Sequence, residues 1–347
     1  MVEKKNKLIV FRLDAGHERG MGHLYRMMTL ADEFRRKGHD CLFVLKRNDV
    51  ASRILDSVKF RCLSYPVHLT EEDIVEKYFK DELEPDLWIF DILSTDETLV
   101  VRTKSMGVPV VSFDDLKGGL LHADLVVNAI AGCWDEESKV SGRIPHVLSG
   151  PRYAIITSDI INLKYKKKMP QEDIRIGVTM GGSDTHGATV KIGQVLSRFD
   201  EKDMYVNFFL GPHFMHDIEM DEMLAAFSHP FTVKKGVSDL YVELINNNLV
   251  ICGGGQTMFE LCSMGMPVMA LANEVHEEKT IRYFERNGAC IDIGSVHKEL
   301  DDEKMCKFID EIKYDLDKLN RLAVNAVQLV DGKGTKRCYS ACAVLIN

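Results

Sequence analysis

Features that mark several other classes of protein are missing from this 347-residue sequence. No apolar run approaches the roughly 18 residues that a membrane span needs, and the amino terminus, MVEKKNK, lacks the apolar stretch of a signal peptide. The nine cysteines are scattered singly without CxxC pairs, which argues against a disulfide framework and a zinc site. A formal net charge of −9 provides no basic surface for nucleic acid or an anionic membrane. We expect a cytoplasmic protein that holds no metal.

Short apolar runs alternate with segments of helical spacing along most of the chain. They include KLIVFR, LWIFD and ADLVVN in the first half, and IRIGVTM, NLVICGG and MPVMAL in the second. This alternation is typical of parallel strands joined by helices. The pattern breaks at LKYKKKMPQED, whose basic cluster and Pro170 indicate a linker. We predict an α/β protein with Rossmann-like domains over residues 1–163 and 171–325, followed by a helical tail, 326–347, that can pack back on the first domain.

The loop after the first predicted strand is the first candidate site, because parallel sheets bind ligands at the carboxyl ends of their strands. In FRLDAGHERGMGHLYR, Gly20 and Gly22 let the backbone turn sharply and approach a ligand. The amino terminus of the following helix disfavours a protonated imidazole, so His23 would be a neutral ring able to act as a general base. The alternative is that His23 only caps the helix. His17 is a second candidate for the base.

A second glycine loop, MGGSDTHGATVK, follows the first strand of the second half. Gly181, Gly182 and Ser183 would present backbone N–H groups and a hydroxyl at a helix start, which suits a diphosphate. The alternative is that Ser183 or Asp184 caps the next helix.

A third glycine loop, CGGGQTMFEL, includes Gly254 and Gly255 and opens another predicted helix. Thr257 and Glu260 are three residues apart and therefore share one face of that helix. A carboxylate in this position can accept hydrogen bonds from both hydroxyls of a ribose. The alternative is that Glu260 is a solvated charge on the helix surface.

A fourth loop follows the apolar strand MPVMAL. Asn273 and Glu274 are polar residues at the end of that strand, where they would border the site. His276 and the glutamates behind it are expected on the surface of the next helix.

Taken together, these motifs resemble one family over nearly the whole chain, in the same order and spacing. It is the family of UDP-2,4-diacetamido-2,4,6-trideoxy-β-L-altropyranose hydrolases of pseudaminic acid biosynthesis. The resemblance implies the GT-B fold, two Rossmann-like domains facing a central cleft, as in the transferase that adds N-acetylglucosamine to lipid-linked muramyl pentapeptide. Spore-coat polysaccharide biosynthesis proteins share much of the pattern. The matching residues are Arg12-x-Asp14, Gly20-x-Gly22-His23-x-x-Arg26, SFDD (112–115), ADLVVN (123–128), GPRYAI (150–155), GGSD (181–184), GGGQTMFEL and Ala272-Asn273.

The resemblance also implies an activity and roles for individual residues. His23 would be the base that activates water at the anomeric carbon, while Glu260 and Asn273 bind the substrate. The reaction would invert that carbon without metal or cofactor, releasing UDP and a di-N-acetylated deoxy sugar for nonulosonic acid or surface polysaccharide biosynthesis. The other residues expected to bind the UDP-sugar are Arg12, Asp14, Gly20, Gly22, Arg26, Gly181, Gly182, Ser183, Gly254, Gly255, Thr257 and Glu274.

The chain departs from the family at two places. The family usually has a His-Tyr-Gly step after the aspartate of the fourth strand, where this chain reads Asp91-Ile92-Leu93-Ser94-Thr95. Thr157 stands where the family tends to have an arginine after the Tyr-Ala-x-x pattern. Both would lie near the sugar or diphosphate, so the UDP leaving group is better supported than the particular sugar. The alternatives are an inverting GT-B glycosyltransferase with a UDP-sugar donor, and a nucleotide-sugar-binding protein without catalysis. The charged segments 65–83 and 96–107 favour water over a lipid acceptor.

Overall fold

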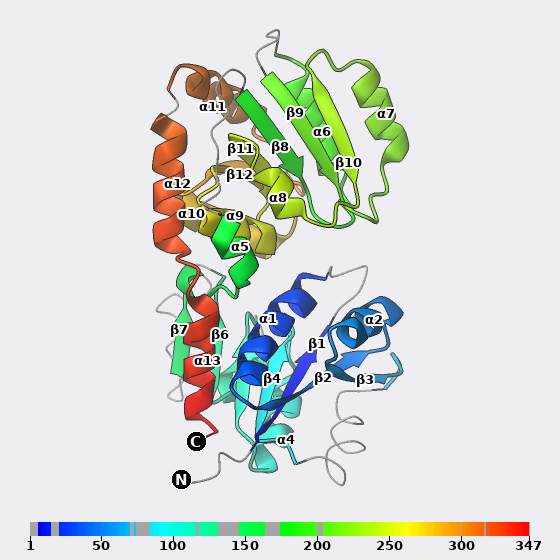
Figure 1. The fold of residues 1–347 in the computed structure, drawn as a ribbon, viewed down its shortest axis with the longest axis vertical. Helices are drawn as coiled ribbons and strands as arrows, with labels where there is room; N and C mark the ends of the chain where they lie inside the picture. Colours follow the sequence, from blue (N-terminus) through cyan, green and yellow to red (C-terminus); the bar gives the residue numbers. More distant parts are fainter. Residues whose placement is uncertain are drawn as a thin grey trace. The chain divides into compact units, whose positions relative to one another are not determined.

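The chain folds into two compact units, shown in Figure 1. The first unit comprises Met1–Thr157 and Lys333–Asn347, and the second comprises Ser158–Gly332. The computed structural model describes residues 6–14, 21–69, 73, 84–115, 118–130, 146–163, 174–199, 204–298, 300–315 and 317–346.

The first unit is built on a seven-stranded parallel sheet with the order β3-β2-β1-β4-β5-β6-β7. The strands are β1 (Leu8–Leu13), β2 (Asp40–Lys46), β3 (Arg61–Tyr65), β4 (Leu87–Asp91), β5 (Val110–Phe113), β6 (Leu125–Asn128) and β7 (His146–Ser149). The helices are α1 (Gly22–Arg36), α2 (Asp49–Ser57), α4 (Glu97–Ser105) and α13 (Gly334–Val344), with short 3₁₀ turns η2 (Gly118–His122) and η4 (Pro151–Tyr153).

Both faces of this sheet are covered, which explains why its central strands are apolar at consecutive positions. Successive side chains of a strand point to opposite faces. In β1, Phe11 joins the core under α1 and α13, whereas Val10 joins the core under α4. The helix α13 contributes Cys338 and Cys342 to the first of these cores, and it lies beside α1 and β6 (Figure 1).

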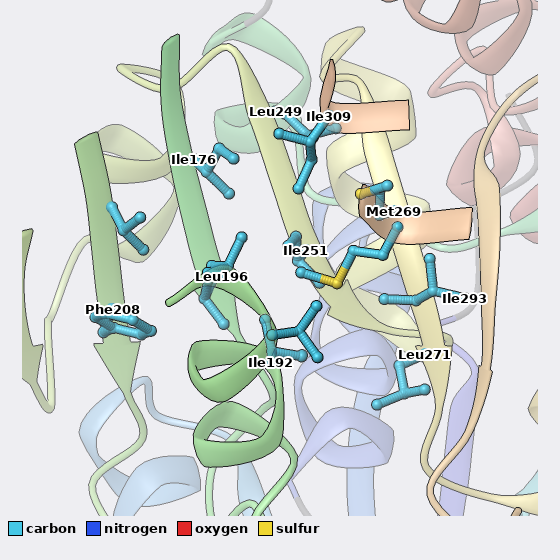
Figure 2. Close-up of a cluster of buried hydrophobic side chains, with 14 of the residues drawn as sticks. Ile176, Ile192, Leu196, Phe208, Leu249, Ile251, Met269, Leu271, Ile293 and Ile309 are labelled. Carbon is cyan, nitrogen blue, oxygen red and sulfur yellow. The ribbon is translucent and has the colours of Figure 1, made fainter. Parts of the chain in front are cut away.

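The second unit is built on a six-stranded parallel sheet with the order β10-β9-β8-β11-β12-β13. Its strands are β8 (Ile174–Thr179), β9 (Met204–Leu210), β10 (Phe231–Lys235), β11 (Leu249–Gly253), β12 (Val268–Ala272) and β13 (Ile291–Ser295). Its helices are α5 (Ser158–Leu163), α6 (Ala188–Leu196), α7 (Asp217–Ala225), α8 (Leu240–Leu244), α9 (Gln256–Met264), α10 (Val275–Arg286), α11 (Asp302–Tyr314) and α12 (Asp317–Leu329). Figure 2 shows Ile251 and Met269 of the strands meeting Ile192 of α6 and Ile309 of α11 in one buried cluster.

The limits of the two units differ from those expected from the sequence. The helix α5 was expected in the first domain, but it contacts α8 and α9 and belongs to the second unit. The expected tail begins at residue 326, which lies inside α12; that helix packs through Leu319 and Leu322 on the core of the second unit. Only α13 joins the first unit. The linker expected at 164–170 lies outside the described residues.

Each sheet has one point at which the strand order reverses, between β1 and β4 in the first and between β8 and β11 in the second. The loops that leave the two strands at such a point turn to opposite faces and open a crevice. Ligands of open α/β sheets bind in this crevice, at the carboxyl ends of the strands. The topology therefore directs attention to the loops after β1, β4, β8 and β11.

Candidate active site

A histidine–aspartate pair lies at the reversal point of the first sheet. His23 is in the first turn of α1, one residue after Gly22, and Asp91 is the last residue of β4. The Nδ1 atom of His23 lies 2.9 Å from Oδ1 of Asp91. Nη2 of Arg26, which can only donate, lies 3.1 Å from the same Nδ1 atom. The carboxylate oxygen is the closer of the two and can only accept, so we assign a proton to Nδ1 and a hydrogen bond from it to Asp91. This tautomer leaves the lone pair on Nε2, an atom that makes no hydrogen bond among the described residues.

Arg26 secures this pair from the next turn of α1. Its Nε donates to Oδ2 of Asp91 at 2.8 Å, and its two terminal nitrogens contact Asp91 and Asp114. Burial opposes the ionisation of Asp91, but Arg26 and His23 lower the pKa of Asp91 to about 2. The two carboxylates likewise raise the pKa of Arg26 above its ordinary value, against the effect of burial. Asp91 is therefore an anion at every working pH.

Asp114 joins three elements at the same edge of the sheet. It follows β5 with a φ of 47°, an uncommon value for a residue with a side chain. Its Oδ1 accepts the backbone N–H of Ala129 at 2.7 Å, while its Oδ2 accepts from Arg26. The carboxylate thus ties the loop after β6 to α1, and it helps to hold the guanidinium that holds Asp91.

Sequence reasoning assigned no role to Asp91 or Asp114, although a signal for the first was present. In the strand LWIFD, Leu87, Ile89 and Asp91 alternate along one face, and both apolar members belong to the core under α1. A carboxylate in the same row must point toward that helix. This places it opposite His23 and Arg26, which share one face of α1 at a spacing of three residues.

Arg12 and Asp14, both predicted to bind substrate, are arranged differently. Arg12 is 2% exposed and lies on the face of β1 turned away from α1, over the ring of Tyr65 at 5.4 Å from its centroid. It donates to Oδ1 of Asp14 at 2.9 Å. Arg12 therefore fixes the end of β1 and orients Asp14. The predicted residues Gly20 and His17 lie outside the described residues.

Glu260 lies in α9, immediately beyond the reversal point of the second sheet. Its Oε2 accepts from the hydroxyl of Tyr241 and its Oε1 accepts from Nε2 of Gln256 at 3.2 Å. Burial raises the pKa of Glu260 to about 7, against the effect of these two donors. Thr257, on the same face of α9, hydrogen-bonds the Tyr241 side chain. Glu260 is thus a half-buried, bonded carboxylate, and its interpretation as a solvated surface charge is wrong.

The glycine run before α9 allows the helix α10 to come close. A Cβ on Gly254 would lie 2.6 Å from the side chain of Ile281, and one on Gly255 would lie 2.9 Å from Oε1 of Glu277. Real Cβ atoms essentially never approach other atoms that closely. The two glycines therefore have a packing role between the loop and α10.

Glu277 was expected on a helix surface, and the structure corrects this. It is 9% exposed, and its carboxylate accepts backbone N–H groups of Asn273 at 2.8 Å, Glu274 at 3.4 Å and Gly254. It thereby joins the glycine run to the turn between β12 and α10. That turn carries the half-buried Asn273 and the exposed Glu274, both predicted to bind substrate. No sequence motif distinguished Glu277 from the neighbouring Glu278.

The loop after β8 shows which of the two proposed caps is used. Asp184 accepts the first two backbone N–H groups of α6, each at 2.8 Å, so it caps that helix. Gly181 and Gly182 are exposed, and Ser183 is half-buried beside them. A diphosphate at this loop would therefore meet the glycine backbone and Ser183, because Asp184 already occupies the end of the helix.

The described residues form neither a metal centre nor a membrane span. They contain no group of three or more His, Cys, Asp or Glu side chains arranged to hold a metal ion. Across the same part of the chain, every helix is too short or too polar to cross a membrane.

Comparison with known sequences gives distant relatives, and no family model matches the chain. It is 28% identical over 280 residues to an uncharacterized protein of Methanocaldococcus jannaschii, covering 76% of this chain and 56% of that protein. It is 24% identical over 327 residues to the spore coat polysaccharide biosynthesis protein SpsG of Bacillus subtilis, covering 93% of this chain and 94% of that protein. It is 27% identical over 199 residues to the UDP-2,4-diacetamido-2,4,6-trideoxy-β-L-altropyranose hydrolase of Campylobacter jejuni, covering 55% of this chain and 66% of that protein. The chain thus spans about half of the first relative and about two thirds of the hydrolase.

Comparison with solved structures decides the fold. MurG of Acinetobacter baumannii matches with a TM-score of 0.70 at 13% identity, over 97% of this chain and 99% of that chain. A glycosyltransferase of Rickettsia africae matches with a TM-score of 0.66 at 12% identity, over 99% of both chains. The UDP-GlcNAc 2-epimerase of Neisseria meningitidis, bound to UDP-GlcNAc, matches with a TM-score of 0.66 at 10% identity. The match covers 97% of this chain and 100% of that chain. The fold is GT-B. The fold class predicted from the sequence is confirmed, with two Rossmann-like domains.

Proposed function

We propose that this protein hydrolyses a UDP-linked sugar at its anomeric carbon, with inversion and without a metal ion. One observation carries the proposal: Asp91 fixes His23 in the tautomer whose Nε2 can accept a proton, at the reversal point of a parallel sheet. The relatives support the class of substrate, since one is named as a UDP-sugar hydrolase and another as a polysaccharide biosynthesis protein.

His23 acts in this proposal as the general base. Its Nε2 takes a proton from water as the water oxygen attacks the anomeric carbon, and the bond from that carbon to the diphosphate oxygen breaks. Attack from the side opposite the departing UDP inverts the carbon. The imidazolium that forms is stabilised by Asp91, which stays ionised. A positioned base of this kind contributes roughly 10²–10⁴ in rate.

The second unit supplies the proposed nucleotide site. Glu260 accepts the ribose hydroxyls, the loop of Gly181, Gly182 and Ser183 meets the diphosphate, and Asn273 contacts the substrate at the adjoining turn. Arg26 was expected to touch substrate, but two carboxylates already neutralise it. We therefore assign Arg26 to the positioning of Asp91 and His23.

We further propose a cytoplasmic setting and a di-N-acetylated deoxy sugar destined for nonulosonic acid or another surface polysaccharide. Free thiols are in keeping with a reducing compartment, and the eight cysteines in the described part of the chain are all unpaired. The sugar follows from the resemblance of the motifs to the hydrolase family.

The test is incubation with a panel of UDP-sugars while ¹H and ³¹P NMR follow UDP and the free sugar. Three proteins are compared: wild type, His23→Asn and the control His122→Asn. His122 is also a histidine of the first unit, but it is half-buried and its Nε2 lies 2.7 Å from a carboxylate oxygen of Glu97. We expect wild type and His122→Asn to release UDP in water alone. Turnover in His23→Asn should fall by roughly 10²–10⁴ with UDP affinity unchanged.

The same experiment distinguishes the alternatives. Release of UDP only after an alcohol acceptor is added would identify an inverting glycosyltransferase. Binding of a UDP-sugar by the wild-type protein without any release would identify a binding protein. Full activity in His23→Asn, with a matching loss in His17→Asn, would move the base to His17.

A further inference from the structure

Tyr241 contacts both residues of α9 that sequence reasoning assigned to the nucleotide. It stands in the short helix α8, on the connection from β10 to β11, and its hydroxyl donates to Oε2 of Glu260. Thr257 hydrogen-bonds the same side chain. Gln256 holds the other carboxylate oxygen of Glu260 at 3.2 Å. The carboxylate is thus fixed at both oxygens before any ligand binds.

This arrangement leaves room for two more hydrogen bonds. A carboxylate offers about four lone-pair positions, two on each oxygen. Tyr241 and Gln256 use one position on each oxygen of Glu260. One position on each oxygen is then available for the two neighbouring hydroxyls of a ribose. Fixing the carboxylate in advance lowers the entropy that the nucleotide must overcome on binding.

The surroundings of Glu260 make these neutral donors important. Burial raises the pKa of Glu260, and the opposing influences are the donors Tyr241 and Gln256. The elements packed against α9 include α5, α12, β11 and β12, together with α8 through Tyr241 and α10 through Phe284. No lysine or arginine in their described parts forms an ion pair with Glu260. On α10, Glu277 is a second buried carboxylate, and burial raises its pKa to about 7. Cys252 of β11 is the other titratable group near Tyr241. Its thiol is neutral, because burial raises its pKa well above the ordinary value.

We propose that Tyr241 is a positioning residue for the nucleotide: its hydroxyl fixes the Glu260 carboxylate and favours the ionised form that accepts the ribose hydroxyls. This inference rests on the proposed function for the identity of the ligand. It does not depend on hydrolysis. Burial and the Glu260 charge raise the pKa of Tyr241 well above 10, so its hydroxyl stays a donor across the whole range in which Glu260 titrates.

Calorimetry of UDP binding between pH 6 and 9 tests the proposal with Tyr241→Phe and the control Tyr205→Phe. Tyr205 is a half-buried tyrosine at the start of β9, under the guanidinium of Arg175, at the opposite end of the sheet. We expect Tyr241→Phe to bind UDP about tenfold more weakly at pH 7. Its affinity should recover toward that of wild type at pH 9, where the carboxylate is ionised in both proteins. A weakening of equal size at every pH would mean general damage to the site and would overturn the proposal.

A second measurement needs no ligand. The ¹³C resonance of the Glu260 carboxyl group, assigned by its absence in Glu260→Gln, can be followed through a pH titration. We expect a midpoint near pH 7 in wild type and one higher by about one pH unit in Tyr241→Phe. Equal midpoints would refute the role of Tyr241. A raised midpoint in a protein that does not bind UDP would support that role and count against the proposed function.

Discussion

Replacing Asp91 by asparagine should remove most of the activity while changing few atoms. Arg26 donates to both oxygens of Asp91, through Nε to Oδ2 at 2.8 Å and through Nη2 to Oδ1. An asparagine amide has a single oxygen, so its nitrogen would meet a nitrogen of Arg26 in either orientation. The substitution also removes the negative charge 2.9 Å from Nδ1 of His23. The imidazolium that forms when His23 takes a proton from water then loses its stabilising anion.

Two magnitudes follow from this geometry. Loss of the carboxylate that holds His23 and stabilises its protonated form should lower kcat by roughly 10²–10⁴, the usual contribution of a general base. Loss of the buried ion pair should also lower the free energy of unfolding. The pKa of Asp91 is lowered from 3.8 to about 2, a difference equivalent to about 2 kcal/mol. Above pH 4 this contribution is fully present, and it is lost as the pH falls through 2.

The assay measures kcat from UDP release, the dissociation constant of UDP by calorimetry, and Tm by circular dichroism. Asp124→Asn is a matched control, since it breaks a 2.8 Å ion pair with Lys104 away from His23. We expect both variants to lose stability and only Asp91→Asn to lose turnover, with UDP affinity unchanged. Normal turnover in a folded Asp91→Asn protein would refute the role of Asp91 in supporting His23.

Four further predictions concern the second unit and the chemistry. Glu260→Gln should weaken UDP binding at pH 8 by about 10- to 100-fold in calorimetry, because an amide accepts less strongly than a carboxylate; unchanged affinity would remove Glu260 from the site. The pKa of Glu260 rises from 4.5 to about 7 on folding, so its contribution to stability is present below pH 4.5 and lost as the pH rises through 7. Urea denaturation should show that the free energy of unfolding of wild type falls by up to about 3 kcal/mol relative to that of Glu260→Gln as the pH rises from 4.5 through 7. Gly254→Ala should lower the free energy of unfolding by about 1–3 kcal/mol, since its methyl group would meet Ile281 at 2.6 Å; Gly182→Ala, with no atom within 4 Å, should not. Turnover should be unchanged by EDTA, and a loss that added divalent ions restore would contradict the metal-free mechanism.

The sequence allows the fold to be predicted well, because each strand and helix leaves a local pattern. The strand LWIFD is apolar at its first four positions because both of its faces are buried. The segment from Gly22 has helical spacing, with His23 and Arg26 three residues apart. These signals involve only nearby residues. They also brought His23, Arg26 and Glu260 into consideration, since each follows a glycine turn at a strand end.

The partners of these residues could not be predicted in the same way, since they come from distant parts of the chain. Asp91 meets His23 because β4 pairs with β1, although β2 and β3 separate them in the sequence. Tyr241 reaches Glu260 from the helix before β11, within a segment that carries no motif. Glu277 stands in a Glu-Glu pair typical of a helix surface, and only the close approach of α10 to the glycine run buries it.

The chain passes between the two units twice, before Ser158 and after Gly332. The second unit is therefore an insertion within the first, whose core includes Cys338 and Cys342 of α13. On a ribosome, α13 emerges only after all of residues 158–332 have been made, a delay on the order of ten seconds or more at about 5–20 residues per second. During that interval the inner face of α1, including Phe34, lacks the helix that covers it. Synthesis thus completes the inserted unit first, and a truncation before α13 leaves the second core intact while it uncovers the unit that holds His23.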